Sequence, residues 1–163
     1  MFLQRIKELV TLGSGDVFGS VLTAIFWFYL ASQVKPDAYG EIHWFLGIAG
    51  IFSYIALFGT LNTITVYTAK NVKIQSTLFL ISILAAAISL AIITIFYNRI
   101  DAGLLAVGFV LFSLVNSVML GKKLFVKYSK LVLSQKILTL ILGLGLYFVF
   151  DVYGIIYGLA LSY

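Results

Sequence analysis

Length, composition and charge exclude most classes of soluble protein. Of the 163 residues, 62% are hydrophobic and 10% are charged, whereas a soluble domain is about 45–50% apolar and about 25% charged. A net charge of +5 would suggest nucleic acid as the partner of a soluble protein. Here the basic residues flank apolar runs, as residues that set membrane topology do, so we expect no nucleic-acid partner.

Apolar runs long enough to cross a membrane recur along the whole chain. A helix rises about 1.5 Å per residue, so about 20 apolar residues cross a hydrocarbon core about 30 Å thick. The run at 79–96 has only three polar interruptions, which excludes the alternation of a barrel strand. We therefore predict an all-α membrane protein, a bundle of about five transmembrane helices plus a partial sixth. The expected spans are residues 9–34, 42–69, 74–97, 102–121 and 131–150, with an incomplete span at 152–163.

Local signals mark the ends of several of these segments. The amphipathic stretch at residues 2–9 is expected to lie at the membrane interface before the chain enters the bilayer. No small-residue cleavage pattern precedes Lys35, so the first apolar run is expected to be a retained helix and not a signal peptide. Pro36 disfavours helix in the residue before it and ends the first span. Gly59 is expected to loosen the second span, and Asp151 marks a turn after the fifth.

The basic residues predict the orientation of the chain. If the N-terminus is cytoplasmic, nine of the eleven basic residues fall on the cytoplasmic side. The positive-inside rule favours that arrangement, in a multi-pass protein of the cytoplasmic membrane. The expected inside residues are Arg5, Lys7, Lys70, Lys73, Lys122, Lys123, Lys127, Lys130 and Lys136, against Lys35 and Arg99 outside.

The segment between the fourth and fifth spans is rich in lysine. Residues 121–136 carry five lysines interleaved with Leu, Phe, Val and Tyr. One interpretation is an interfacial stretch attracted to anionic membrane lipid. The other is a plain cytoplasmic loop that sets topology. The four lysines that precede the expected fifth span are Lys122, Lys123, Lys127 and Lys130.

Asp16 is the only acid well inside an apolar segment. Charge at membrane depth is costly and tends to mark ion or substrate paths, so Asp16 is a candidate for a substrate cavity. It is equally a candidate for a helix cap or a solvated position near the cytoplasmic surface. Gly15 and Gly19 have the small-xxx-small spacing of close helix packing, which is the role we expect for them.

Two further polar patches lie in the second and fourth spans. Asn62 and Thr65 share one face at a spacing of three residues, and Asn116 lies among serines. Such faces either line a hydrophilic cavity for a sugar head group or form hydrogen bonds between helices. Asn62, Thr65 and Asn116 are therefore candidates for a substrate cavity.

Nothing in the sequence indicates an enzyme. The single histidine, His43, lies beside Trp44 and Tyr39 and fits an interfacial aromatic belt better than a proton relay. A multi-histidine or cysteine metal site is excluded. The sequence has no phosphate loop, dinucleotide fingerprint or catalytic triad. We expect no catalysis, no cofactor and no metal.

The order of these features resembles a known family of transporters. A short basic start precedes GSGDVFGSVLTAIFWFYLAS, and the loop KPDAYGEI contains a Pro-x-x-Tyr-Gly element at Pro36, Tyr39 and Gly40. The second apolar segment, with Gly59 and Lys70, the later QKILTLILGLGLYFVF and the final GIIYGLALSY are similar in order and spacing as well. The chain resembles the polysaccharide and O-antigen flippases of the multidrug/oligosaccharidyl-lipid/polysaccharide exporter superfamily.

The resemblance implies one lobe of a two-lobe exporter that moves lipid-linked oligosaccharide across the membrane by alternating access. The family's members have more spans than this chain, so the resemblance also implies a partial N-terminal lobe that works with a remaining lobe. One alternative is a cation-coupled drug or small-molecule antiporter of the same superfamily, for which Asp16 is the only coupling carboxylate available. Another is a small, non-transporting membrane assembly protein.

Overall fold

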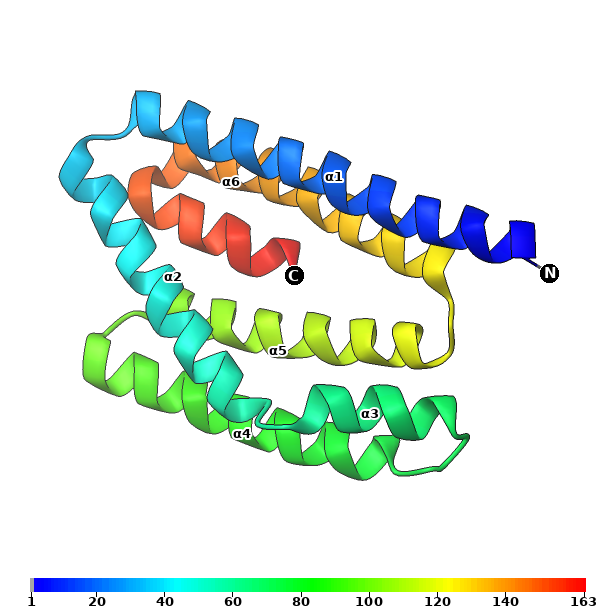
Figure 1. Ribbon diagram of the computed structural model, residues 1–163. Coiled ribbons are helices and arrows are strands. Elements are labelled where there is room, and N and C mark those ends of the chain that lie inside the picture. Colours follow the sequence, from blue (N-terminus) through cyan, green and yellow to red (C-terminus); the bar gives the residue numbers. More distant parts are fainter. Residues whose placement is uncertain (1) are drawn as a thin grey trace.

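The computed structural model describes the backbone of residues 2–163 and the side chains of residue 13 and residues 15–163. Over this range the chain is a bundle of helices joined by short connections (Figure 1). The prediction of an all-α fold is confirmed. The helices are α1 (Phe2–Gln33), α2 (Pro36–Ala56), α3 (Thr60–Ala69), α4 (Gln75–Tyr97), α5 (Ile100–Gly121) and α6 (Phe125–Ser162).

Within the described residues, four helical segments are long and apolar enough to cross a membrane, and a bent pair raises the number to five. The single segments are Gly15–Gln33 within α1, and α4, α5 and α6; the bent pair is α2 with α3. Many large apolar side chains point outward, among them Phe58, which is 91% exposed, and Phe28, which is 79% exposed. A water-facing surface of this kind would be unstable, whereas lipid accepts it. We conclude that the chain is a multi-pass membrane protein.

The first helix is longer than the sequence predicts. The backbone of residues 2–9 continues α1 without a break (Figure 1), so this stretch is part of the first helix, whose candidate membrane span begins at Gly15. Its side chains, including those of Arg5 and Lys7, lie outside the described residues. The helix ends before Lys35, which is extended with φ −60° and ψ 147°, and Pro36 opens α2 as its first residue. Proline suits that position because the first helical N–H has no partner within the helix.

The second expected span is broken. The span expected at 42–69 corresponds to a bent pair of helices: α2 begins at Pro36, and α2 and α3 meet at a bend of 51°. Gly59 has φ 69° at the break, a left-handed conformation that glycine adopts without steric cost. The break is stabilised by backbone hydrogen bonds from Leu57 N to Ser53 O (3.0 Å) and from Thr60 N to Leu57 O (2.8 Å).

The long helix α6 reverses at Asp151, where the sequence predicts a turn. Asp151 has φ 55° and ψ −138°, which interrupts the helix, and the final segment runs back along the first (Figure 1). The two arms pack backbone to backbone. A Cβ atom added to Gly154 would lie 1.9 Å from Leu146 O, and one on Gly158 would lie 2.7 Å from Gly143 Cα. Only glycine allows this approach.

The order of packing places α5 at the centre of the bundle. It contacts α2, α3, α4 and α6, whereas α1 packs mainly along α6. The connections lie at two ends (Figure 1). We call the end with the α1–α2 and α4–α5 links and the Asp151 reversal the Arg99 end. The other, with the α3–α4 and α5–α6 links, is the lysine end.

Candidate functional site

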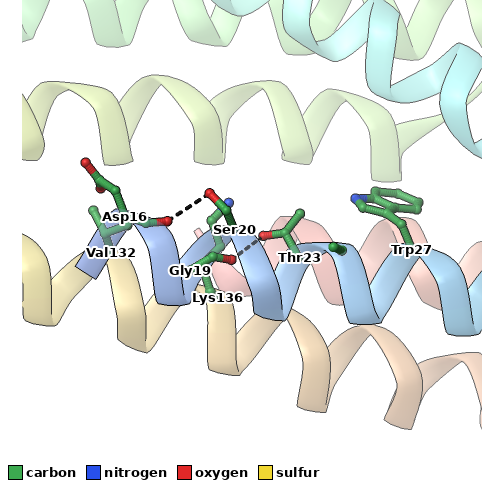
Figure 2. Close-up of a pocket in the computed structure, with 8 residues that line it drawn as sticks. Asp16, Gly19, Ser20, Thr23, Trp27, Val132 and Lys136 are labelled. Carbon is green, nitrogen blue, oxygen red and sulfur yellow. Dashed lines mark hydrogen bonds between the residues drawn. The ribbon is translucent and has the colours of Figure 1, made fainter. Parts of the chain in front are cut away.

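A polar groove lies beside α1 where this helix packs against α6 (Figure 2). Its volume is about 490 Å³, which falls in the range of about 300–1,000 Å³ typical of ligand pockets. Most of its polar groups come from α1, with two residues from α6. The groove is lined by Asp16, Gly19, Ser20, Thr23, Ala24, Trp27, Val132 and Lys136.

Helical periodicity explains why the α1 residues line one groove. Asp16, Ser20, Thr23 and Trp27 follow one another at spacings that place them on one face of a helix. Ser20 donates to Asp16 O and Thr23 donates to Gly19 O, both at 2.8 Å (Figure 2). These bonds use the hydroxyl protons and leave the hydroxyl oxygens free to accept. The face therefore offers acceptors and an indole in an otherwise apolar helix.

Lys136 supplies the cation of the groove. Its stem crosses α1 at Gly19, where an added Cβ atom would lie 3.4 Å from Lys136 Cγ. Neither Lys136 nor Asp16 forms a salt bridge, because the only salt bridges among the described side chains are those of Arg99. Asp16 is exposed and Lys136 is half-buried. An unpaired lysine within a membrane-spanning helix favours an anionic ligand, since placing a charge there is costly.

The remaining cavity candidates lie elsewhere. Asn62 is exposed on α3, and Thr65 donates to Leu61 O at 2.9 Å and to Ser117 O at 3.3 Å, which ties α3 to α5. Asn116 is half-buried on α5, and its Oδ1 has no hydrogen-bond partner in the described part of the chain. Because the described residues of α1 have no contact with α3 or α5, these candidates and Asp16 do not line one pocket.

The two packing glycines both face α6. A Cβ atom on Gly15 would lie 3.0 Å from Ser129 Cβ, and Gly19 adjoins the Lys136 stem. The small-xxx-small pair therefore lies along the contact between α1 and α6, the same contact that forms the groove.

The basic segment after α5 is mostly helix. Lys123, at φ 57°, makes the turn, and α6 begins at Phe125, so Lys127 and Lys130 stand on its first turns. Lys123, Lys127 and Lys130 line a depression of about 390 Å³ together with Leu124, Phe125 and Val126. Lys122 faces a different pocket, with the α3–α4 turn.

The most highly organised polar cluster was not identified from the sequence. Arg99, which is 7% exposed, binds Asp101 through two donor nitrogens, at 2.8 Å from Nη2 and 3.0 Å from Nε, and also donates to Glu41 of α2. Its guanidinium lies 4.1 Å from the Phe45 ring centre and 4.4 Å from that of Tyr153. Burial alone would lower the pKa of Arg99, but the two carboxylates outweigh it and the pKa is raised. Because Arg99 is paired with both carboxylates, we interpret this cluster as one that holds α2 and α5 together.

His43 belongs to an aromatic group at the Arg99 end. Its ring lies 4.6 Å from the rings of both Trp27 and Tyr39. Among the described residues, no group of three or more His, Cys, Asp or Glu side chains is placed to hold a metal ion.

With this geometry in hand, the chain was compared with known proteins. No protein-family model, no curated protein and no solved structure matches it.

Proposed function

We propose that the chain is part of a transporter that flips lipid-linked oligosaccharide or polysaccharide repeat units across the cytoplasmic membrane, with its N-terminus in the cytoplasm. The observation that carries the proposal is the unpaired Lys136 in a hydroxyl-lined groove between membrane helices.

The groove suits the chemistry of such a substrate. Lipid-linked glycans join a phosphate to a sugar, so they need a cation beside groups that bind hydroxyls. Lys136 supplies the cation, and charge-assisted hydrogen bonds to phosphate are among the strongest in proteins. Ser20 and Thr23 offer oxygens to sugar hydroxyls, and Trp27 offers an apolar ring for a sugar face. The apolar outer surface of the bundle suits the lipid tail.

The resemblance supplies the second half of the proposal. In a two-lobe exporter, the face of each lobe that carries the substrate groups is covered by the other lobe. We propose that the α1 groove faces the remaining lobe and that alternating access exposes it to one side of the membrane at a time.

Transport in cells tests the role of Lys136. The complete transporter that contains this chain, expressed in a flippase-deficient strain, is expected to restore export of surface glycan. Lys136→Gln is expected to lower that export about tenfold or more, because a hydrogen bond to a charged group contributes about 1.5–3 kcal/mol. Lys130→Gln is the matched control, since Lys130 stands on the same helix outside the groove. Equal export by both variants at equal expression would contradict the proposal.

Asp16 favours a second candidate, a cation-coupled antiporter of the same superfamily. It is the only carboxylate among the described residues that line the groove, and such antiporters need a carboxylate that exchanges a proton or sodium ion. No rescue of glycan export, together with proton-dependent drug efflux that Asp16→Asn abolishes, would replace the first proposal by the second.

A further inference from the structure

A second polar pocket lies at the lysine end, away from the α1 groove. The turn between α3 and α4 and the end of α5 enclose about 410 Å³, again within the range of ligand pockets. The pocket is lined by Thr68, Asn71, Val72, Lys73, Gln75, Ser76 and Lys122.

Packing between α3 and α5 fixes the position of Lys122. A Cβ atom added to Gly121 would lie 2.7 Å from both Thr65 O and Thr68 Cβ, so α5 ends in direct contact with the α3 backbone. Thr65 donates to Ser117 O across the same contact. Lys122 follows at once and is held by its N–H bond to Val118 O at 2.9 Å. Its side chain therefore starts from a rigid point beside the turn.

The turn is ordered as well. Asn71 adopts φ 58°, and its N–H and that of Val72 bond to Thr68 O and Tyr67 O at 3.1 and 3.0 Å. Gln75 Nε2 donates to Thr68 Oγ1 at 2.8 Å, which links the end of α3 to the start of α4. Lys73 belongs to this ordered turn. Lys73 and Lys122, from two separate connections, therefore line the same pocket.

The pocket lacks negative charge of its own. In the described part of the chain, neither Lys73 nor Lys122 has a salt bridge. The carboxylates of Glu41 and Asp101 are at the opposite end with Arg99, and Asp16 is on α1, which does not contact α3, α4 or α5. Two cations beside amide and hydroxyl groups make a receptor for an oxyanion. Its place at the bundle end, beside long apolar helices, suggests that the oxyanion is carried by a lipid.

We propose that this pocket binds the phosphate group of an anionic lipid. The same chemistry has two sources, the headgroup of a bilayer phospholipid and the diphosphate of a prenyl-linked glycan. The proposal does not depend on transport, because it concerns different residues from those of the α1 groove.

The proposal is tested by measuring how tightly matched double variants bind anionic lipid. The full chain in neutral detergent is titrated with phosphatidylglycerol, with farnesyl diphosphate and with zwitterionic phosphatidylcholine, and bound lipid is counted by native mass spectrometry. Lys73→Gln/Lys122→Gln is expected to weaken binding of an anionic probe about tenfold or more. The control Lys35→Gln/Lys70→Gln removes the same charge from exposed positions that line neither lysine-end pocket and is expected to weaken binding less than about twofold, because charges not in contact are screened. Phosphatidylcholine is expected to show no difference.

The two anionic probes separate the sources. A selective loss with phosphatidylglycerol assigns the pocket to a bilayer headgroup, and a selective loss with farnesyl diphosphate alone assigns it to a prenyl-linked substrate. Equal losses in both double variants would overturn the proposal, since they would mean diffuse attraction only. The unaltered chain gives an independent measurement: the bound probe should protect Lys73 and Lys122 from acetylation while Lys70 still reacts. Equal acetylation of all three would also overturn it.

Discussion

The two ends of the bundle differ in whether their basic side chains are paired with acids. At the Arg99 end, a buried guanidinium binds two carboxylates and lies against two aromatic rings, joining α2, the start of α5 and the return arm of α6. At the lysine end, the described lysines have no salt bridge and surround pockets. A paired cation holds helices together, whereas an unpaired one remains available to lipid or ligand. The paired charges of the Arg99 end therefore favour stability, whereas the unpaired lysines of the other end are the groups on which the proposed lipid binding depends.

The largest expected effect comes from removing the paired cation. Arg99→Met would leave Asp101, which is 2% exposed, without its partner. Because an uncompensated buried charge is strongly destabilising, we expect a loss of about 3 kcal/mol in the free energy of unfolding, measured by denaturation in detergent. Lys35→Gln, at the same end but exposed and without a salt bridge, is expected to change stability by less than about 0.5 kcal/mol.

A double variant distinguishes pairing from packing at this cluster. Arg99→Met/Asp101→Leu should recover part of the stability lost in Arg99→Met, because no unpaired carboxylate then remains buried. No recovery would mean that Arg99 acts through its stem and its ring contacts. An equal loss in Arg99→Met and Lys35→Gln would remove the contrast between the two ends.

The next effect concerns the tight reversal at the Arg99 end. In Gly154→Ala, the added methyl carbon would lie 1.9 Å from Leu146 O, which is closer than two such atoms can approach. The α6 arms must separate, so we expect a loss of about 2 kcal/mol in the free energy of unfolding. Gly145→Ala is the matched control on the same helix, because an added Cβ there meets nothing within 4 Å. If both variants unfold at the same denaturant concentration, the two arms do not pack as closely as described.

Sequence alone predicts features that depend on local chemistry. The helix boundary at Pro36 follows from the conformation that proline favours, and the reversal at Asp151 is indicated by a charged residue between two apolar runs. At Gly59 the sequence indicates a weak point, but the size of the bend depends on how α3 packs against α5 through Thr65 and Ser117. A pattern of apolar residues contains no such contact between distant segments.

The candidate site shows the same limit. Helical spacing places Asp16 and Lys136 within apolar segments, but only the packing of α1 on α6 brings them to one groove. The sequence also grouped Asn62, Thr65 and Asn116 with Asp16 by polarity, although α1 does not contact their helices. The Arg99 cluster was missed because Glu41 and Arg99 are 58 residues apart. No local sequence pattern indicates that charges so far apart in the chain form a pair.

The smallest expected effect on stability belongs to a pair of turn residues that reports which end faces the cytoplasm. Asn71 at the lysine end and Asn98 at the Arg99 end are both exposed and have φ values of 58° and 51°. Cysteine at either position should lower stability by a similar amount, about 1 kcal/mol, because asparagine tolerates the left-handed conformation better than cysteine does. The chain has no native cysteine, so each variant carries a single thiol. With a membrane-impermeant maleimide, Asn98→Cys is expected to react in intact cells and Asn71→Cys only after permeabilisation, because the lysine-rich end should face the cytoplasm. The reverse pattern would invert the proposed orientation and would place the unpaired lysines on the outer surface.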